Sequence, residues 1–576
     1  MTTKQHFKVC FCFKRIFKLR VPEPPEDIKY LFGKYSENGT MTIDNIQQFL
    51  IEVQGEHNAS KDSAQAIINS HKHLNLFPRK GLSLVAFFRY LISDNNANPL
   101  HRPEQYDMEA PLAHYFLYTG HNSYLTGNQI SSDSSVNPII DALKKGVRVI
   151  ELDLWPNSNK DDVEVRHGGT LTRPVELIKC LLAIKEHAFE KSEYPVVITF
   201  EDHLGPKLQA KVAQMVTKTF RDSLYRHESE YIEEFPSPES LKRKILISTK
   251  PPKEYLDDQS SMEREGSQSQ EDSEEEKTYQ GTGQRELEPN DEVEIHNQEE
   301  DEASVAPEYR KIIAIHAGKP KGGLEDCLDL TNKTVRRLSL SEQELESATK
   351  THGTAIVRFT QRNLLRVYPK GMRFDSSNYN PMLGWMHGAQ MVAFNMQGYG
   401  KFLWIMQGMF RANGGCGYVK KPDFLLRTDR VFDPSVVPLI KKKLKVSVLM
   451  GEGWLHDFDR KYFDRFSPPD FFVKVGIAGF PEDEIKHETK AIEDEWRPVW
   501  NEEFEFPLRV PELAVLRIEA LEYDTAGPAD FAGQTCLPVS ELRSGIRAVP
   551  LYNKMGDKYA HVKLLMGFEF IRLSMY

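Results

Sequence analysis

Short apolar runs with alternating polar side chains predict β-strands through the middle of the chain. In residues 147–155 one face carries Val147 and Val149 and then Glu151 and Asp153, whereas from position 150 the other face is apolar. Successive side chains of a strand point to opposite faces. Both carboxylates are therefore predicted to point the same way, just beyond two apolar layers.

Two more runs follow this pattern to different degrees. Residues 196–201 repeat it and end in Glu201, with apolar residues on the opposite face. Residues 163–167, which end in His167, fit it less well because charged side chains interrupt the other face. Each run is a candidate strand that ends in a polar side chain.

Strand-like runs alternate with amphipathic helices across residues 107–252, and strand-like runs continue across 308–425. Alternation of β and α units is typical of a parallel sheet with helices outside it. Between them, residues 257–306 are acidic and poor in apolar side chains, a composition typical of disorder. We therefore predict one α/β barrel of the TIM type that is split by a disordered acidic insertion.

The spacing of apolar residues is different at the two ends of the chain. Residues 24–102 show helical spacing, and a loop centred on Gly39 resembles half of an EF-hand. That loop places Lys34 and Asn45 where calcium requires acidic residues, so we expect an EF-hand-like helical domain that binds no calcium there. Residues 437–567 break into short strands and turns, which predicts an antiparallel β-sandwich.

Composition indicates a large cytosolic protein. The chain has 576 residues, 40% of them hydrophobic, and six cysteines, which provide no disulfide framework. No apolar stretch is long enough to cross a bilayer, and basic residues interrupt the N-terminal apolar positions, so we expect no secretory signal. The net charge of −10 is dominated by residues 257–302, and the remainder is mildly basic, which suits an anionic membrane surface. We expect no nucleic-acid partner.

The N-terminal segment, residues 1–23, interleaves basic and aromatic side chains. One interpretation is an interfacial membrane segment that could be acylated at Cys10 or Cys12. The other is a frayed tail with no membrane role.

The candidate chemistry gathers where the predicted barrel strands end. His121 and Asn122, the Glu151 and Asp153 pair, His167 and Glu201 fall within about eighty residues. Side chains from the ends of several barrel strands meet at one face of a barrel. This set predicts a site for metal-assisted phosphoryl transfer.

These motifs, in this order, resemble the phosphoinositide-specific phospholipase C family of eukaryotes. Residues 107–252 are similar to its X box, residues 308–425 to its Y box and the C-terminal module to its C2 domain. No pleckstrin-homology domain precedes the helical region, as in the plant branch of the family. Residues 375–379 also match a family signature, but the sequence gives them no physical role.

The resemblance implies one Ca²⁺ held by oxygen atoms of Asn122, Glu151, Asp153 and Glu201. It further implies that Glu151 is the general base, with Asp153 as the alternative. His121 would stabilise charge on the phosphate, and His167 would protonate the leaving group.

The resemblance also implies a set of side chains that bind the lipid headgroup: Lys250, Ser339, Arg366 and Tyr368. One departure concerns Ser248, where many animal relatives carry a lysine. The preference for phosphatidylinositol 4,5-bisphosphate over less phosphorylated lipids is therefore left open.

Two acidic loops of the C-terminal module form a second candidate calcium site, as in C2 domains: Asp464, Asp470, Glu522, Asp524 and Asp530. The alternative is a pair of solvated acidic loops without a bound ion.

The function that the resemblance implies is calcium-dependent hydrolysis of phosphoinositides in lipid signalling. The products would be diacylglycerol and an inositol phosphate, formed by attack of the inositol 2-hydroxyl through a cyclic phosphate. We expect the enzyme in the cytoplasm, peripherally bound to the anionic inner face of the plasma membrane. Two alternatives are a glycerophosphodiester phosphodiesterase and a catalytically silent lipid-binding scaffold.

Overall fold

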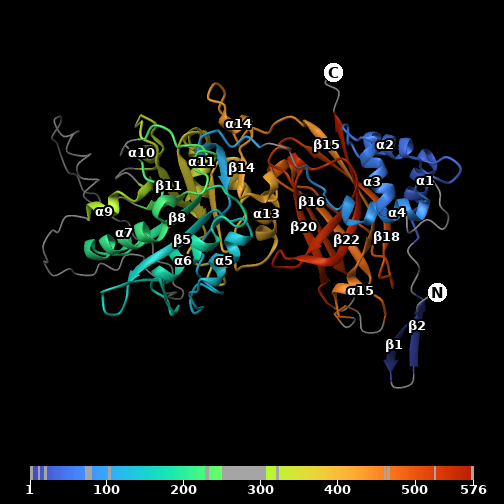
Figure 1. Ribbon diagram of the computed structural model, residues 1–576, viewed down its shortest axis with the longest axis horizontal. Coiled ribbons are helices and arrows are strands. Elements are labelled where there is room, and N and C mark those ends of the chain that lie inside the picture. Colours follow the sequence, from blue (N-terminus) through green and yellow to red (C-terminus); the bar gives the residue numbers. More distant parts are fainter. Residues whose placement is uncertain are drawn as a thin grey trace, which may run out of the picture.

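The computed structural model describes residues 4–572, except for 11–12, 19–22, 72–80, 102–105, 228–231, 250–305, 319–322, 332, 460–461, 464–466 and 525–526. An antiparallel sandwich lies between a barrel and the N-terminal helices (Figure 1). The predicted acidic insertion lies outside the described residues. In the described part, no helix is both long and apolar enough to span a membrane.

The barrel consists of eight parallel strands that are adjacent in chain order. The strands are β4 (Thr119–Gly120), β5 (Val149–Pro156), β8 (Val196–Asp202), β9 (Ile245–Thr249), β10 (Ile313–His316), β11 (Arg337–Ser341), β12 (Leu364–Tyr368) and β13 (Met391–Phe394). The strand β13 pairs with β4, and a single parallel bridge between Ala317 and Arg337 connects β10 to β11. The TIM-type barrel predicted from the sequence is confirmed.

Helices surround these strands on the outside (Figure 1). They are α5 (Asn137–Lys144), α6 (Leu177–His187), α7 (Pro206–Phe220), α9 (Pro307–Arg310), α10 (Leu324–Leu328), α11 (Glu342–Thr360), α12 (Met382–Met386), α13 (Lys401–Met409) and α14 (Asp423–Leu426). Ile150 and Leu152 pack into the cluster that these helices share with the sheet, whereas Val149 and Val197 pack inside the barrel. The predicted two faces of these strands are confirmed.

Val147 departs from the prediction. It packs with the helix-side cluster rather than inside the barrel. The reason is local, because β5 begins only at Val149 and Gly146 has a positive φ of 99°. The two-residue period therefore does not extend back to position 147.

A hairpin outside the barrel explains the poor fit of residues 163–167. The strand β6 (Val163–Val165) pairs antiparallel with the end of β5 and with β7 (Val175–Glu176). His167 thus reaches the site from a side hairpin and not from a barrel strand.

The described part of the N-terminal region contains the α-helices α1 (Glu26–Tyr35), α2 (Ile43–Glu52), α3 (Lys61–His71) and α4 (Leu84–Ile92). In the first turn of α2, the Asn45 side chain forms a capping box with Thr42 and donates to Glu37 at 3.3 Å. Asn45 therefore has a structural role at the position where calcium needs an acidic ligand. Absence of calcium binding there stays a prediction.

The C-terminal module is an antiparallel sandwich, as predicted. Its strands are β15 (Lys442–Glu452), β16 (Phe471–Ala478), β17 (Lys486–Glu488), β18 (Val499–Leu508), β19 (Val515–Glu522), β20 (Asp530–Pro538), β21 (Gly545–Tyr552) and β22 (Lys558–Arg572). A single residue pair joins β20 to β21, so the order divides into two four-stranded halves. The chain start adds a hairpin that the sequence did not predict, β1 (Lys4–Cys10) with β2 (Phe13–Lys18).

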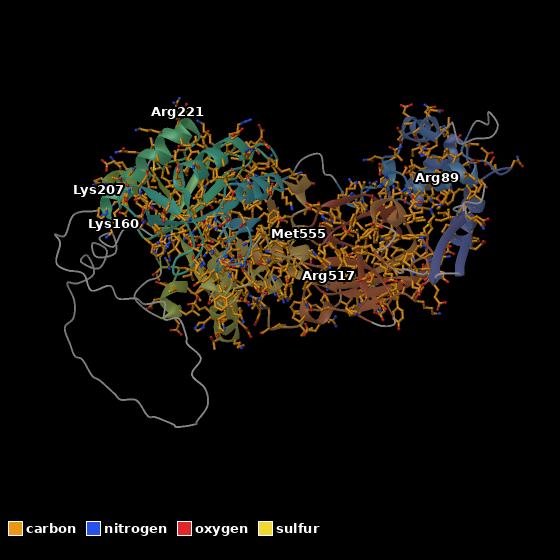
Figure 2. All side chains as sticks on the ribbon, turned by 90° about the horizontal axis from the view of Figure 1, so that it is seen from below. Arg89, Lys160, Lys207, Arg221, Arg517 and Met555 are labelled. Carbon is orange, nitrogen blue, oxygen red and sulfur yellow. The ribbon has the colours of Figure 1, made fainter. Side chains whose placement is uncertain are left out.

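The sandwich packs closely against the barrel through α13. The Trp404 ring lies 5.5 Å from the Phe531 ring, and a Cβ at Gly408 would lie 2.4 Å from the Cys536 Cβ. Lys145, which follows α5, also donates to the Met555 carbonyl at 3.4 Å, and Met555 lies at the junction of the two bodies (Figure 2).

A buried polar network joins the sandwich to the N-terminal helices. Arg547 of β21 donates to Glu56 at 3.1 Å, to Asn96 at 3.3 Å and to the Gln54 carbonyl. Its side chain is 1% exposed. A buried guanidinium is stable only with partners of this kind.

We expect Arg547→Met to destabilise the protein by about 1–3 kcal/mol, because it leaves the buried Gln54 carbonyl without its donor, whereas Glu56 keeps its ion pair with Arg543. Thermal and urea unfolding of the full chain would measure this change. The control is Arg427→Met, which removes an exposed ion pair with Asp429. If both substitutions lowered the stability equally, the buried network would not contribute more than an exposed ion pair.

Candidate metal and phosphodiester site

Three carboxylates meet at the C-terminal ends of two neighbouring barrel strands. Oxygen atoms of Glu151, Asp153 and Glu201 lie within 4.8 Å of one another. Asp153 of β5 and Glu201 of β8 are register partners in the parallel pair. In the part of the chain that the structure describes, this is the one cluster of acidic, His and Cys groups with metal-binding geometry.

Asp153 shows that this cluster suits a cation. One of its carboxylate oxygens, Oδ2, accepts a hydrogen bond of 2.7 Å from the Tyr124 hydroxyl. Its Oδ1 is buried and has no hydrogen-bond partner among the described residues. Burial, and then the charges of Glu201 and Glu151, raise the pKa of Asp153 well above its usual value. A hard divalent cation would satisfy the free oxygen and reduce the repulsion.

The other two carboxylates have cationic or polar neighbours. Glu151 is buried, forms an ion pair with Arg366 and accepts from the Asn122 backbone at 3.3 Å. Glu201 accepts from His203 at 3.1 Å, and this bond lowers the pKa of Glu201 to about 2. The His203 ring in turn stacks on Trp155, with 4.0 Å between the ring centroids.

A chain of amides holds the Asn122 side chain in place. Asn122 has a positive φ of 41° and donates through Nδ2 to Gln129 Oε1 at 2.9 Å. Gln129 donates through Nε2 to Asn395 Oδ1 at 3.1 Å and to the Ser376 hydroxyl at 2.8 Å. Because each donor faces an acceptor, the Asn122 Oδ1 atom remains available for a cation.

The same network holds both histidines. The His121 Nδ1 atom lies 3.0 Å from Asn395 Oδ1, and the His167 Nδ1 atom lies 2.8 Å from the Gln129 carbonyl. Both carbonyl-type oxygens require a protonated Nδ1, so each Nε2 is left for other partners. Burial lowers the pKa of His121.

Residues 375–379 now have a physical role. Ser376, with a positive φ of 59°, donates to the Gly127 carbonyl at 2.7 Å and contacts Gln129. Asn378 bonds both backbone groups of Asn395. Residues 375–379 thus stabilise the amide network that contacts the two histidines.

The predicted headgroup residues lie on two adjacent strands. Ser339 of β11 is the register partner of Arg366 of β12. The Arg366 guanidinium lies 5.1 Å from the centre of the Tyr368 ring. Lys250 lies outside the described residues. Arg366 therefore belongs to the same cluster as Glu151, a contact that the sequence did not predict.

Exposed apolar side chains surround this site. Leu171, which is 81% exposed, donates through its backbone to the Ile130 carbonyl at 2.8 Å, close to His167. Phe374 accepts from the Gln129 backbone at 2.9 Å and is also exposed, as is Met372 beside it. Neither this rim nor the role of Gln129 is predicted by the sequence, because both depend on contacts between distant segments.

The second candidate calcium site is only partly assembled. Glu522 pairs with Asp530 across β19 and β20, and Asp470 precedes β16 beside them, with its carbonyl 2.8 Å from the Tyr523 nitrogen. Asp524 is exposed, and Asp464 lies outside the described residues. The described carboxylates at this end do not form a three-residue cluster within 4.8 Å.

Models of known families match most of the chain. The X domain of phosphatidylinositol-specific phospholipase C matches residues 108–251, and its Y domain matches 324–424. The EF-hand-like model of phosphoinositide-specific phospholipase C matches residues 23–98, and the C2 domain matches 442–553.

Similar proteins span the full chain. Phosphoinositide phospholipase C 2 of Arabidopsis thaliana is 56% identical over 99% of this chain and all of its own length. The mouse 1-phosphatidylinositol 4,5-bisphosphate phosphodiesterase delta-3 is 33% identical over 96% of this chain and 68% of its own. Among solved structures, PLC21 of L. pealei superposes with a TM-score of 0.77 at 25% identity, covering 96% of this chain and 69% of that one.

We expect Ca²⁺ to raise the unfolding temperature, and to raise it more as the pH increases from about 5 to about 8. The raised pKa of Asp153 contributes stability below the ordinary aspartate pKa of about 4 and loses it as the pH rises. A bound cation stabilises the ionised Asp153 carboxylate, so the folded protein no longer loses this stability as the pH rises. In Asp153→Asn the calcium effect should shrink and lose its pH dependence, while the exposed control Asp141→Asn should behave like the wild type. A pH-independent calcium effect in the wild type would contradict this assignment.

We expect Gln129→Met to weaken calcium affinity about 10- to 100-fold, because the Asn122 amide loses the partner that orients it. Isothermal titration calorimetry would measure the change. Gln361→Met is the matched control, since Gln361 is also buried but bonds the carbonyls of Leu425 and Arg427 instead. Unchanged affinity in Gln129→Met would show that the amide chain does not orient a ligand.

Proposed function

Because the chain belongs to the phosphoinositide-specific phospholipase C family, we propose that its barrel site uses Ca²⁺ and two histidines to cleave the headgroup phosphodiester of phosphatidylinositol 4,5-bisphosphate. At the level of the family, the chain is a phosphoinositide-hydrolysing phospholipase C. The lipid preference, the ion and the role of each residue belong to the proposal.

One observation carries the proposal. Three carboxylates, one oriented amide and two imidazoles converge at the mouth of one barrel, although they come from four separate segments. Such a set is costly to assemble without an ion and a polar ligand, since like charges repel and Glu151 and Asp153 are buried.

The ion would be held by Asn122, Glu151, Asp153 and Glu201. The Asp153 Oδ1 atom, which has no hydrogen-bond partner among the described residues, fits this role, and Gln129 already holds the Asn122 Nδ2 atom. When bound, Ca²⁺ lowers the pKa of a coordinated hydroxyl and offsets negative charge on a phosphate. Oxygen atoms of water and of a phosphate group commonly complete the coordination of such an ion.

The protein groups would act around the phosphodiester in distinct positions. Glu151 would accept the proton of the inositol 2-hydroxyl as that oxygen attacks phosphorus, with Asp153 as the alternative base. His121 would donate to a non-bridging phosphate oxygen, and His167 would give a proton to the departing diacylglycerol oxygen. Water would then open the cyclic phosphate, with His167 as the base that activates it.

The headgroup would lie against β11 and β12. Ser339 and Arg366 supply a hydroxyl and a guanidinium side by side, and Tyr368 offers a ring beside them. Arginine binds phosphate with two parallel hydrogen bonds, which suits a phosphorylated inositol. Lys250, which follows β9, would add a second cation.

Membrane contact would bring the site to its substrate. The exposed apolar rim beside His167 and Gln129 suits insertion into the outer part of a lipid layer. The acidic loops of the sandwich would bind Ca²⁺ at Asp464, Asp470, Glu522, Asp524 and Asp530 and then attract anionic lipid. Both features favour peripheral binding at the cytoplasmic face of the plasma membrane.

We expect His167→Ala and His121→Ala each to slow release of inositol phosphate from labelled vesicles by at least about 100-fold. Chelation of Ca²⁺ should abolish release by the wild type. His352→Ala, which changes a histidine of α11 outside the site, is the control. If His167→Ala kept full turnover with its calcium affinity intact, the proposed acid would be wrong.

A further inference from the structure

Arg337 is a buried arginine of the barrel interior that the mechanism above does not use. It begins β11, where Leu338 and Leu340 pack against the outer helices. Because side chains alternate along a strand, Arg337 and Ser339 face the interior together. Its side chain is almost fully buried.

The Arg337 guanidinium lies at the level of the candidate metal site. It donates to the Ser248 hydroxyl at 2.8 Å and to the Thr199 hydroxyl at 3.2 Å. Thr199 is the register partner of both Ser248 and Glu151. The guanidinium therefore occupies the same layer as a carboxylate of the site.

Other buried arginines of the described chain are matched by stronger acceptors. Arg148 donates to the carbonyls of Leu143 and Ala188, among others, and Arg366 and Arg547 pair with carboxylates. Arg337 has two hydroxyl partners, no ion pair among the described residues, and an Nε atom without a partner.

The electrostatic environment destabilises a buried guanidinium at this position, which is unfavourable for a residue with only a structural role. Burial, and then the neighbouring charge of Arg366, lower the pKa of Arg337 to about 9. The Glu151 carboxylate offsets only part of this effect. Two hydroxyls could be bridged by a neutral side chain, and a buried cation without a directly bonded counter-charge costs free energy. An anion that arrives at the site would supply the partner that the Arg337 Nε atom lacks among the described residues.

We propose that Arg337 is a specificity-determining residue that binds a phosphate group on the inositol ring of the lipid. This inference rests on the proposed function, because the ligand is the headgroup of the substrate. A ring phosphate carries up to two negative charges and would reach the free donors of Arg337 beside those of Arg366. Ser248 and Thr199 hold the guanidinium in place before the lipid arrives.

The proposal gives Ser248 a defined role. A serine on β9 supplies no charge of its own, but its hydroxyl accepts from Arg337 and donates to the Ile315 carbonyl at 3.2 Å. The cation for this part of the headgroup thus comes from β11, and β9 only anchors it. Recognition of a phosphorylated ring would be retained despite the serine at position 248.

The test compares kcat/KM of the full-length protein on vesicles of phosphatidylinositol and of phosphatidylinositol 4,5-bisphosphate. We expect Arg337→Met to lower the preference for the bisphosphate by about 10- to 100-fold, the usual effect of losing a charge-assisted hydrogen bond to phosphate. Arg337→Lys should recover part of that preference. The double variant Arg337→Met with Ser248→Lys, which returns a cation from β9, should recover it as well.

Arg336→Met is the matched control. Arg336 is the preceding residue, and it donates outward to the carbonyls of Cys327 and Asp329. It should leave the lipid preference unchanged. Unfolding temperatures of all variants separate a loss of stability from a loss of recognition.

Three outcomes would overturn the inference. The first is that Arg337→Met lowers turnover of both lipids equally, which would make Arg337 structural. The second is that Ser248→Lys fails to restore the preference in a folded double variant. The third is that inorganic phosphate inhibits the wild type but not Arg337→Met, while both proteins have the same lipid preference. Arg337 would then bind free phosphate and not the lipid headgroup. If the wild type hydrolysed neither lipid, the proposed function itself would fail.

Discussion

Mutual repulsion among three carboxylates is the constraint on which the barrel site depends. Glu151, Asp153 and Glu201 are brought together because β5 and β8 are parallel neighbours in register. A different partner stabilises each negative charge. Glu151 forms an ion pair with Arg366, Asp153 accepts a hydrogen bond from the Tyr124 hydroxyl, and Glu201 accepts one from His203. These partners reduce the repulsion without removing it, since one Asp153 oxygen stays unsatisfied. The fold therefore holds a site that a cation completes.

The sequence predicted the parts of this site that depend on local periodicity. The two-residue period placed Glu151, Asp153 and Glu201 inside the barrel, because strand geometry fixes which face a side chain occupies. It could not predict that His167 arrives from the β6 hairpin, since antiparallel pairing with β5 is a tertiary contact. It also placed Val147 inside the barrel, although the strand begins two residues later.

The amide network was beyond sequence reasoning for a related cause. Gln129 bonds Ser376 and Asn395, which lie about 250 residues further along the chain. A lone glutamine in a loop gives no periodic signal, and its importance comes from the number of functional groups it connects. The domain boundaries and the acidic loops of the sandwich stay predictions, because the structure leaves parts of both undescribed.

The close contact between α13 and β20 has a mechanical consequence. A single methyl group could not be added at Gly408 without a clash with Cys536, and the Trp404 indole also donates to the Lys554 carbonyl at 2.9 Å. A junction packed this closely resists hinge motion at α13. Whatever tilt the sandwich adopts on a lipid layer would be transmitted to the barrel as by a rigid arm, and would set the angle at which its opening meets the headgroups.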